Sequence, residues 1–117
     1  MRSVTIALPL PPKELHQNAR VHWATYSRVA KLYRYHAKLA AMKSRKSFLR
    51  ATVSFAWYFP DRRVRDELNF IGAMKNAVDG IVDSKLIASD SWQNLHFIEG
   101  SVAVDKDNPR VEITIAD

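Results

Sequence analysis

The densest group of residues that could carry out chemistry lies in the segment 61–90. Asp66 and Glu67 begin a helical pattern directly after three arginines, and Asp90 follows in the loop beyond that helix. Hard cations such as Mg²⁺ bind one or two carboxylates and keep water in their other positions. An ion held in this way can activate water for attack on a phosphodiester. Asp66 and Asp90 therefore form a candidate metal site, in which a nearby lysine would stabilise charge at phosphorus.

Asp66 also has a structural interpretation, which remains open. A carboxylate at the beginning of a helix accepts hydrogen bonds from free backbone N–H groups and favours the positive end of the helix dipole. The metal interpretation requires in addition that the loop after Asp83 folds back. Only then can Asp66 and Asp90 meet at one end of a sheet.

The charge of the chain is divided between its two halves. Residues 1–65 hold 14 Lys and Arg but only two acids, a net charge of +12, whereas residues 66–117 hold four basic and ten acidic residues, a net charge of −6. The whole chain has a net charge of +6 and a pI near 9.8. A basic half of this kind favours a polyanionic partner such as DNA. The alternative is a solvated basic surface without a specific ligand.

Two groups of basic residues are expected to contact the phosphates of DNA. The group directly before the candidate carboxylates consists of Arg62, Arg63 and Arg65. The group on the outer side of an earlier predicted helix consists of Arg28, Lys31, Arg34 and Lys38. Such contacts position a nucleic-acid backbone without reading bases, which suits recognition by shape. For the helical group, a simple solvated face is an equal alternative.

The composition restricts the other classes of function. The 117 residues fit one domain covering the whole chain, 1–117. There are no cysteines, which excludes disulfides, thiolate metal sites and a cysteine nucleophile. With only three glycines there is no phosphate-binding loop, so no nucleotide cofactor is expected. No apolar run is long enough to span a membrane, and we expect a cytoplasmic protein.

Hydrophobic periodicity predicts the elements that must position these residues. Strands are predicted at Ser3–Leu8, Ala51–Phe59 and Arg110–Ile115, with further strand-like segments in 92–104 that are interrupted at Gly100. Helices are predicted over 22–42 and 66–82, and Gly80 together with 83–85 is expected to mark the end of the second. Their apolar faces would be formed by Tyr26, Val29, Tyr33, Ala37 and Ala40, and by Ile71, Met74, Val78 and Ile81. The expected fold is α/β (α+β), a small mixed β-sheet with two helices packed on one face.

Several segments in this order resemble one known family. They are TIALPLPP, PDRRVRDELN, MKNAVDGIVDSKLIASDSW and RVEITI. Together they resemble the RusA family of phage and prophage Holliday-junction resolvases, which are crossover junction endodeoxyribonucleases, over nearly the whole chain. The resemblance implies a homodimer in the bacterial cytoplasm that binds four-way DNA junctions. It would nick two strands of like polarity symmetrically, with Mg²⁺ or Mn²⁺ as cofactor.

The same resemblance assigns roles to individual residues. Asp66 and Asn69 take the positions of the first aspartate and the asparagine in the family's D-x-D-N motif. Asp90 takes the position of the second aspartate in D-D-S. Lys75 lies one turn beyond Gly72, the position where the family often has a lysine, and is expected to assist catalysis electrostatically.

Two positions depart from the family pattern. The second aspartate of D-x-D-N is replaced by Leu68, which cannot bind a metal, and the first aspartate of D-D-S is replaced by Ser89. Glu67 is a candidate replacement ligand, although neighbouring helical positions point about 100° apart. The alternative function is therefore a junction-binding protein of the same fold with weak or no catalysis.

Overall fold

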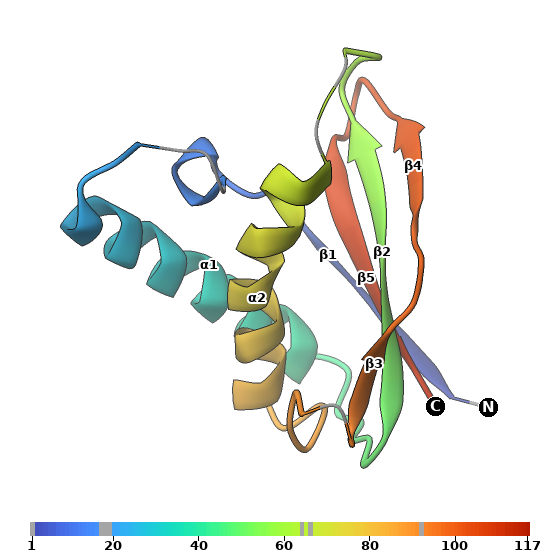
Figure 1. The fold of residues 1–117 in the computed structure, drawn as a ribbon. Coiled ribbons are helices and arrows are strands. Elements are labelled where there is room, and N and C mark those ends of the chain that lie inside the picture. Colours follow the sequence, from blue (N-terminus) through green and yellow to red (C-terminus); the bar gives the residue numbers. More distant parts are fainter. Residues whose placement is uncertain (1, 17–19, 64, 66, 92) are drawn as a thin grey trace.

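A computed structural model gives the fold of the chain (Figure 1). It describes residues 2–16, 20–63, 65, 67–91 and 93–117, and for residues 67–69 it describes the backbone only. The elements follow the predicted order of strand, helix, strand, helix and further strands. A mixed sheet forms one layer and two helices form the other, so the predicted fold class is confirmed.

The sheet has five strands, three of which form its antiparallel part. β1 (Ser3–Leu8) pairs with β5 (Arg110–Ala116), and β5 pairs with β2 (Ala51–Phe59). Along the other side of β2 lie two short strands, β3 (Leu95–Phe97) and β4 (Ser101–Val104), both parallel to it. β3 and β4 thus form a free edge of the sheet within the described residues.

Gly100 separates the two edge strands, as predicted. A Cβ atom at this position would lie 1.8 Å from the carbonyl oxygen of Phe55 on β2. Because only glycine permits such a close approach, the edge can stay beside β2 while its pairing is interrupted between β3 and β4.

Alternation along the strands sends one set of side chains to a single face. Val53 pairs with Ile115, Phe55 with Ile113 and Trp57 with Val111, and all six side chains are buried. Burial of each such side chain contributes about 1.5–3 kcal/mol to folding. This face is the one that the helices cover.

The helices are α1 (Trp23–Met42) and α2 (Glu67–Asp83), and both lie on that face of the sheet (Figure 1). A single turn of 3₁₀ helix, η1 (Lys13–Leu15), lies between β1 and α1 and buries Leu15. No described helix is sufficiently long and apolar to cross a membrane.

The predicted apolar faces of the helices are partly correct. Met74, Val78 and Ile81 of α2 are buried as predicted, whereas Ile71 is 41% exposed because Phe70 takes its place in the core. On α1, Tyr33 and Ala37 are buried, but Tyr26 is exposed. The reason is geometric, because the first turns of α1 extend beyond the sheet (Figure 1).

The second helix ends in the predicted segment 83–85, but the part assigned to Gly80 in that end is wrong. α2 continues to Asp83, and Gly80 lies where it crosses α1. A Cβ atom at this position would lie 2.1 Å from the carbonyl oxygen of Arg34. The glycine therefore permits the close approach of the two helices instead of ending one of them.

Candidate functional site

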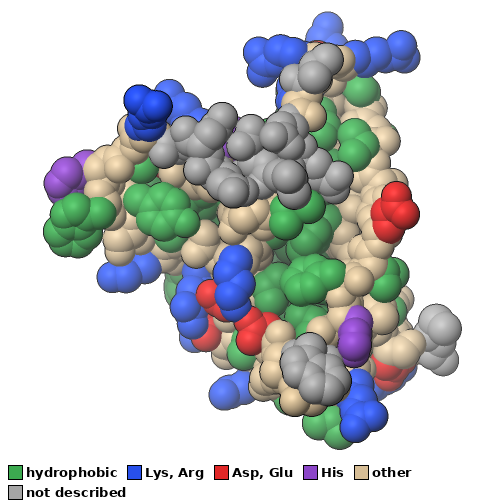
Figure 2. All heavy atoms as spheres, in the orientation of Figure 1, with side chains coloured by type: hydrophobic (Ala, Val, Ile, Leu, Met, Phe, Trp, Pro, Cys, Tyr) green, Lys and Arg blue, Asp and Glu red, His purple; other side chains and the backbone are tan. Residues whose placement is uncertain are grey.

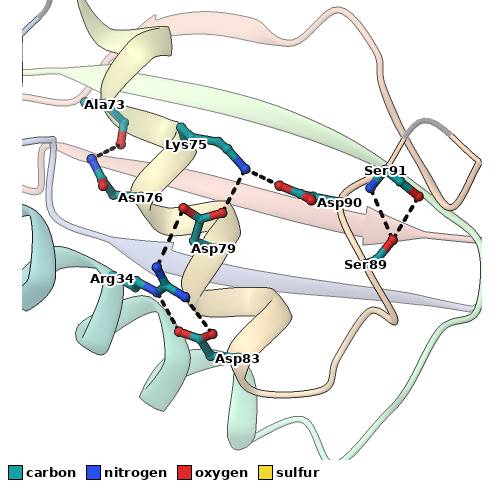
Figure 3. Close-up of polar contacts among 9 residues, drawn as sticks. All are labelled: Arg34, Ala73, Lys75, Asn76, Asp79, Asp83, Ser89, Asp90 and Ser91. Carbon is teal, nitrogen blue, oxygen red and sulfur yellow. Dashed lines mark hydrogen bonds and ion pairs between the residues drawn. The ribbon is translucent and has the colours of Figure 1, made fainter.

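Lys75 and Asp90 are brought together by the fold. The ammonium Nζ of Lys75, on α2, donates a short hydrogen bond to the Oδ2 atom of Asp90, in the loop that follows the helix (Figure 3). These residues are 15 positions apart, and the family resemblance assigns both to one catalytic site. Of the predicted catalytic residues, these two are described, and they are in direct contact.

The loop that carries Asp90 is fixed by hydrogen bonds. The loop forms two backbone hydrogen bonds with Phe48. The N–H of Phe48 donates to the carbonyl oxygen of Leu86 at 2.7 Å, and the N–H of Ala88 donates to the carbonyl oxygen of Phe48 at 3.2 Å. This pairing anchors the loop to the segment before β2, and the contact of Asp90 with Lys75 shows that the loop returns to α2. The loop after Asp83 therefore folds back, as the metal interpretation required.

Ser89, which the RusA resemblance aligns with an aspartate, shapes the same loop. Its hydroxyl accepts a hydrogen bond from the backbone N–H of Ser91 at 3.2 Å and lies 2.9 Å from the Ser91 hydroxyl. It also donates to Oδ1 of Asn94 at 3.2 Å. Ser89 thus supports the turn beside Asp90 without adding a charge.

Two acids that were not predicted as site residues, together with Arg34, which was predicted as a DNA contact, extend the contact into a network. Asp79 accepts a hydrogen bond from Lys75 at 2.8 Å, and Arg34 of α1 bonds to both carboxylate oxygens of Asp83 at 2.6 and 2.9 Å. Arg34 also lies 3.9 Å from Asp79. We call these five residues the ion-pair network: Arg34, Lys75, Asp79, Asp83 and Asp90. Arg34 thus turns toward α2, which corrects its predicted place on the outer, cationic side of α1.

The charges in the ion-pair network stabilise one another. Hydrogen bonds from Lys75 lower the pKa of Asp90, and those from Arg34 lower the pKa of Asp83. The pKa of Lys75 is raised, most strongly by its hydrogen bond to Asp79 and to a smaller extent by its hydrogen bond to Asp90. All three groups are charged at neutral pH. The network is accessible to a ligand, since the Lys75 side chain is 62% exposed.

The segment before α2 presents the other basic group at the end of β2. Arg65 is fixed in place: it pairs with Asp61 at 2.8 Å, and its guanidinium lies 4.6 Å from the centre of the Phe59 ring. Asp61 also accepts a hydrogen bond from the backbone of Arg63 at 3.0 Å, which together with Arg65 lowers its pKa. Arg62 and Arg63 are exposed.

These arginines border a pocket of about 180 Å³ at the end of the sheet. Its other walls are the ring of Phe59 and the strand β4, through Val102, Ala103 and Val104. Figure 2 shows Lys and Arg side chains gathered at this end, directly above apolar side chains of the sheet edge. We call this feature the arginine pocket.

The remaining predicted site residues are distributed as follows. Asp66 lies outside the described residues, as do the side chains of Glu67, Leu68 and Asn69. Arg28 and Lys31 are exposed on α1, and Lys38 is partly exposed. Neither group of predicted DNA contacts on α1 or before α2 is buried in the core.

The described acids offer a limited set of metal ligands. Among the described residues, no group of three or more His, Asp or Glu side chains is placed to hold a metal ion. Asp79 and Asp90 nevertheless place carboxylate oxygens around one ammonium group. Hard oxygen donors of this number fit Mg²⁺, which keeps several waters. Glu67, the further candidate ligand, lies at the beginning of α2, eight residues before Lys75. This spacing places its backbone about 12 Å from that of Lys75 along the helix axis.

The fold and this arrangement define a small α+β protein in which a helical lysine meets an aspartate from the following loop. No protein-family model matches the chain. It is 36% identical over 108 residues to an uncharacterized protein of Xylella fastidiosa (strain Temecula1), an alignment that covers 87% of this chain and 69% of that protein. The chain belongs to the same family as that protein.

Proposed function

We propose that the protein is a metal-dependent endonuclease that acts on four-way DNA junctions as a homodimer. The observation that carries the proposal is the contact between Lys75 and Asp90, because the RusA resemblance places Asp90 in the D-D-S motif and Lys75 one turn beyond the position of the family's lysine. The exposed Arg62 and Arg63 add support, since they lie in the segment directly before the same helix. A homodimer follows from the substrate, because paired nicks on a two-fold junction need two related active sites.

In this proposal Asp66 and Asp90 hold Mg²⁺, or Mn²⁺ in its place, with Glu67 as a further ligand. When bound, the ion supplies an activated water and neutralises charge at phosphorus. Lys75 holds a positive charge at the carboxylate of Asp90, where it can stabilise the negative charge of the reacting phosphate. Arg62 and Arg63 bind the neighbouring phosphates of the same strand.

Cleavage of a synthetic four-way junction in the presence of Mg²⁺ tests the proposal. We expect Asp90→Asn to reduce the cleavage rate at least about 100-fold, since it removes a charged ligand from the reacting centre. Asp83→Asn is the matched control, because Asp83 belongs to the same ion-pair network but pairs with Arg34. The proposal fails if the parent chain does not cleave, or if both variants cleave at the parent rate.

A second candidate is a junction-binding protein that has lost catalysis. It is favoured by Leu68 in the D-x-D-N motif, which removes a carboxylate from the predicted metal site. This protein would bind junctions tightly with strong salt dependence but without need of a metal. Leu68→Asp distinguishes the two: a large gain in cleavage indicates a decayed site, and an unchanged, measurable rate indicates that the existing carboxylates suffice.

A further inference from the structure

The arginine pocket has walls of a kind that phosphate binding alone does not require. We propose that it receives the base of an unpaired nucleotide, whose adjacent phosphates are bound by Arg62 and Arg63. The inference rests on the proposed DNA-binding function and deepens it, because it names the structural feature of DNA that the protein selects.

The apolar wall of the pocket is an uncovered part of the sheet. Val102 pairs with Trp57 and Val104 with Phe59, so both valines point to the face that the helices cover elsewhere. No helix within the described part of the chain covers them, and they are 62% and 48% exposed. Phe59 completes this wall and stacks nearly parallel on Trp57, which fixes its ring.

The polar side of the pocket is held ready before a ligand arrives. Arg65 is only 13% exposed and is anchored by Asp61, while its Nη1 donates to the backbone oxygens of Asp61 and Arg63 at 3.1 Å each. Arg62 and Arg63 have no ion pair with any described residue. The pocket thus carries three guanidinium groups against one carboxylate.

This combination selects for an anion with a flat apolar body. A nucleobase stacks on guanidinium planes and contacts exposed apolar side chains, and its strand carries phosphates on either side of the base. A volume of about 180 Å³ suits a single base. A base inside a duplex is stacked and paired, so it reaches a pocket only when it is extruded, whereas an unpaired base is already available.

The inference is tested with two labelled four-way junctions that differ at one position of the branch. One carries an unpaired thymidine there, and the other carries an abasic site. We expect the thymidine junction to bind roughly 10-fold more tightly, because stacking of one base is worth about that factor or more. Thymidine monophosphate at the concentration of the junction should not compete, since the pocket is expected to bind a base held by its strand.

Val102→Trp should remove this preference by filling the pocket from its exposed wall. Ile98→Trp is the matched control, because Ile98 is also exposed on this edge but does not line the pocket. We expect the control to keep the preference for the thymidine junction.

The outcomes separate the two proposals. Equal affinity of the parent chain for the two junctions overturns the pocket inference and leaves junction binding intact. A preference that survives in Val102→Trp, or competition by the free nucleotide, also overturns it. Failure to bind either junction at low salt overturns the proposed function itself.

Discussion

The ion-pair network and the arginine pocket use the same basic residue types in opposite ways. In the network, Arg34 and Lys75 each contact two carboxylates, so their charge is compensated inside the molecule. In the pocket, Arg62 and Arg63 face solvent without an ion pair among the described residues. Both regions contribute to the net charge, but of the two only the pocket has arginines without an ion pair among the described residues.

The largest expected effect comes from forcing apart the helices that form the ion-pair network. Gly80→Val would place side-chain atoms against the Arg34 backbone, where even a Cβ lies 2.1 Å from the oxygen. We expect a loss of about 3 kcal/mol or more in the free energy of unfolding, because overpacking at a backbone contact cannot relax easily. Urea denaturation followed by circular dichroism measures it.

Gly72→Ala is the control for that substitution. Gly72 is exposed on the same helix, so alanine should be neutral or add up to about 1 kcal/mol of stability. If Gly80→Val and Gly72→Ala had the same unfolding midpoint, the contact between the two helices would not limit the size of residue 80.

The next effect separates the free arginines from the paired ones. The double variant Arg62→Gln with Arg63→Gln should weaken junction binding about 10-fold at moderate salt and reduce the slope of log affinity against log salt by about two. Arg34→Gln should change affinity less than about twofold, because Arg34 is already neutralised. Fluorescence anisotropy over a salt series provides both values, and equal losses in the two variants would contradict the comparison.

A smaller effect is expected on stability when the network loses a cation. Arg34→Gln removes a two-bond contact to Asp83 that joins α1 to α2. Since the side chains are partly exposed, we expect a loss of only about 0.5–1 kcal/mol. Arg62→Gln, which has no such contact, should leave the unfolding midpoint unchanged. A larger loss in Arg62→Gln than in Arg34→Gln would refute the assignment of free and paired charges.

The smallest effect appears in the dependence of stability on pH. The pKa of Asp83 is lowered below its ordinary value of 3.8 in the folded state, so the unfolded chain binds more protons as the pH falls through this range. The stabilisation by Asp83 is therefore complete above about pH 5 and is lost progressively below about pH 4. We expect the difference in unfolding midpoint between the parent and Asp83→Asn to shrink on acidification. A constant difference would show that Asp83 acts through its shape and not through its charge.

The parts of the fold with local signals were predictable. Alternation between apolar and small polar residues placed β2 at Ala51–Phe59 with both ends correct. The role of Gly80 was not predictable, because a glycine near the end of a helical pattern looks like a stop signal unless the crossing helix is known. The predicted burial of Ile71 was wrong for a similar reason, since only tertiary packing decides that Phe70 fills that part of the core.

In the candidate site, too, contacts with a signal in the sequence were predictable and contacts made by tertiary packing were not. Asp90 and Lys75 were predicted to share a site because Asp90 matches a motif of the resemblance and Lys75 lies one turn beyond the position of its lysine, and the two are in contact. The spacing of four residues between Lys75 and Asp79 on one helix was an unused signal. Arg34 and Asp83 are 49 residues apart, and nothing local links them. Asp66 lies outside the described residues, so its role stays a prediction.

The parallel pairing of β4 with β2 has a consequence for the order in which the molecule assembles. Parallel neighbours cannot form a hairpin, so the chain must complete the crossover through α2 before β4 can reach β2. The valine wall of the arginine pocket therefore comes into place late in folding, after long-range closure. A nascent or partly folded chain carries the arginines without the wall, and selectivity for a nucleotide would arise only with the finished protein.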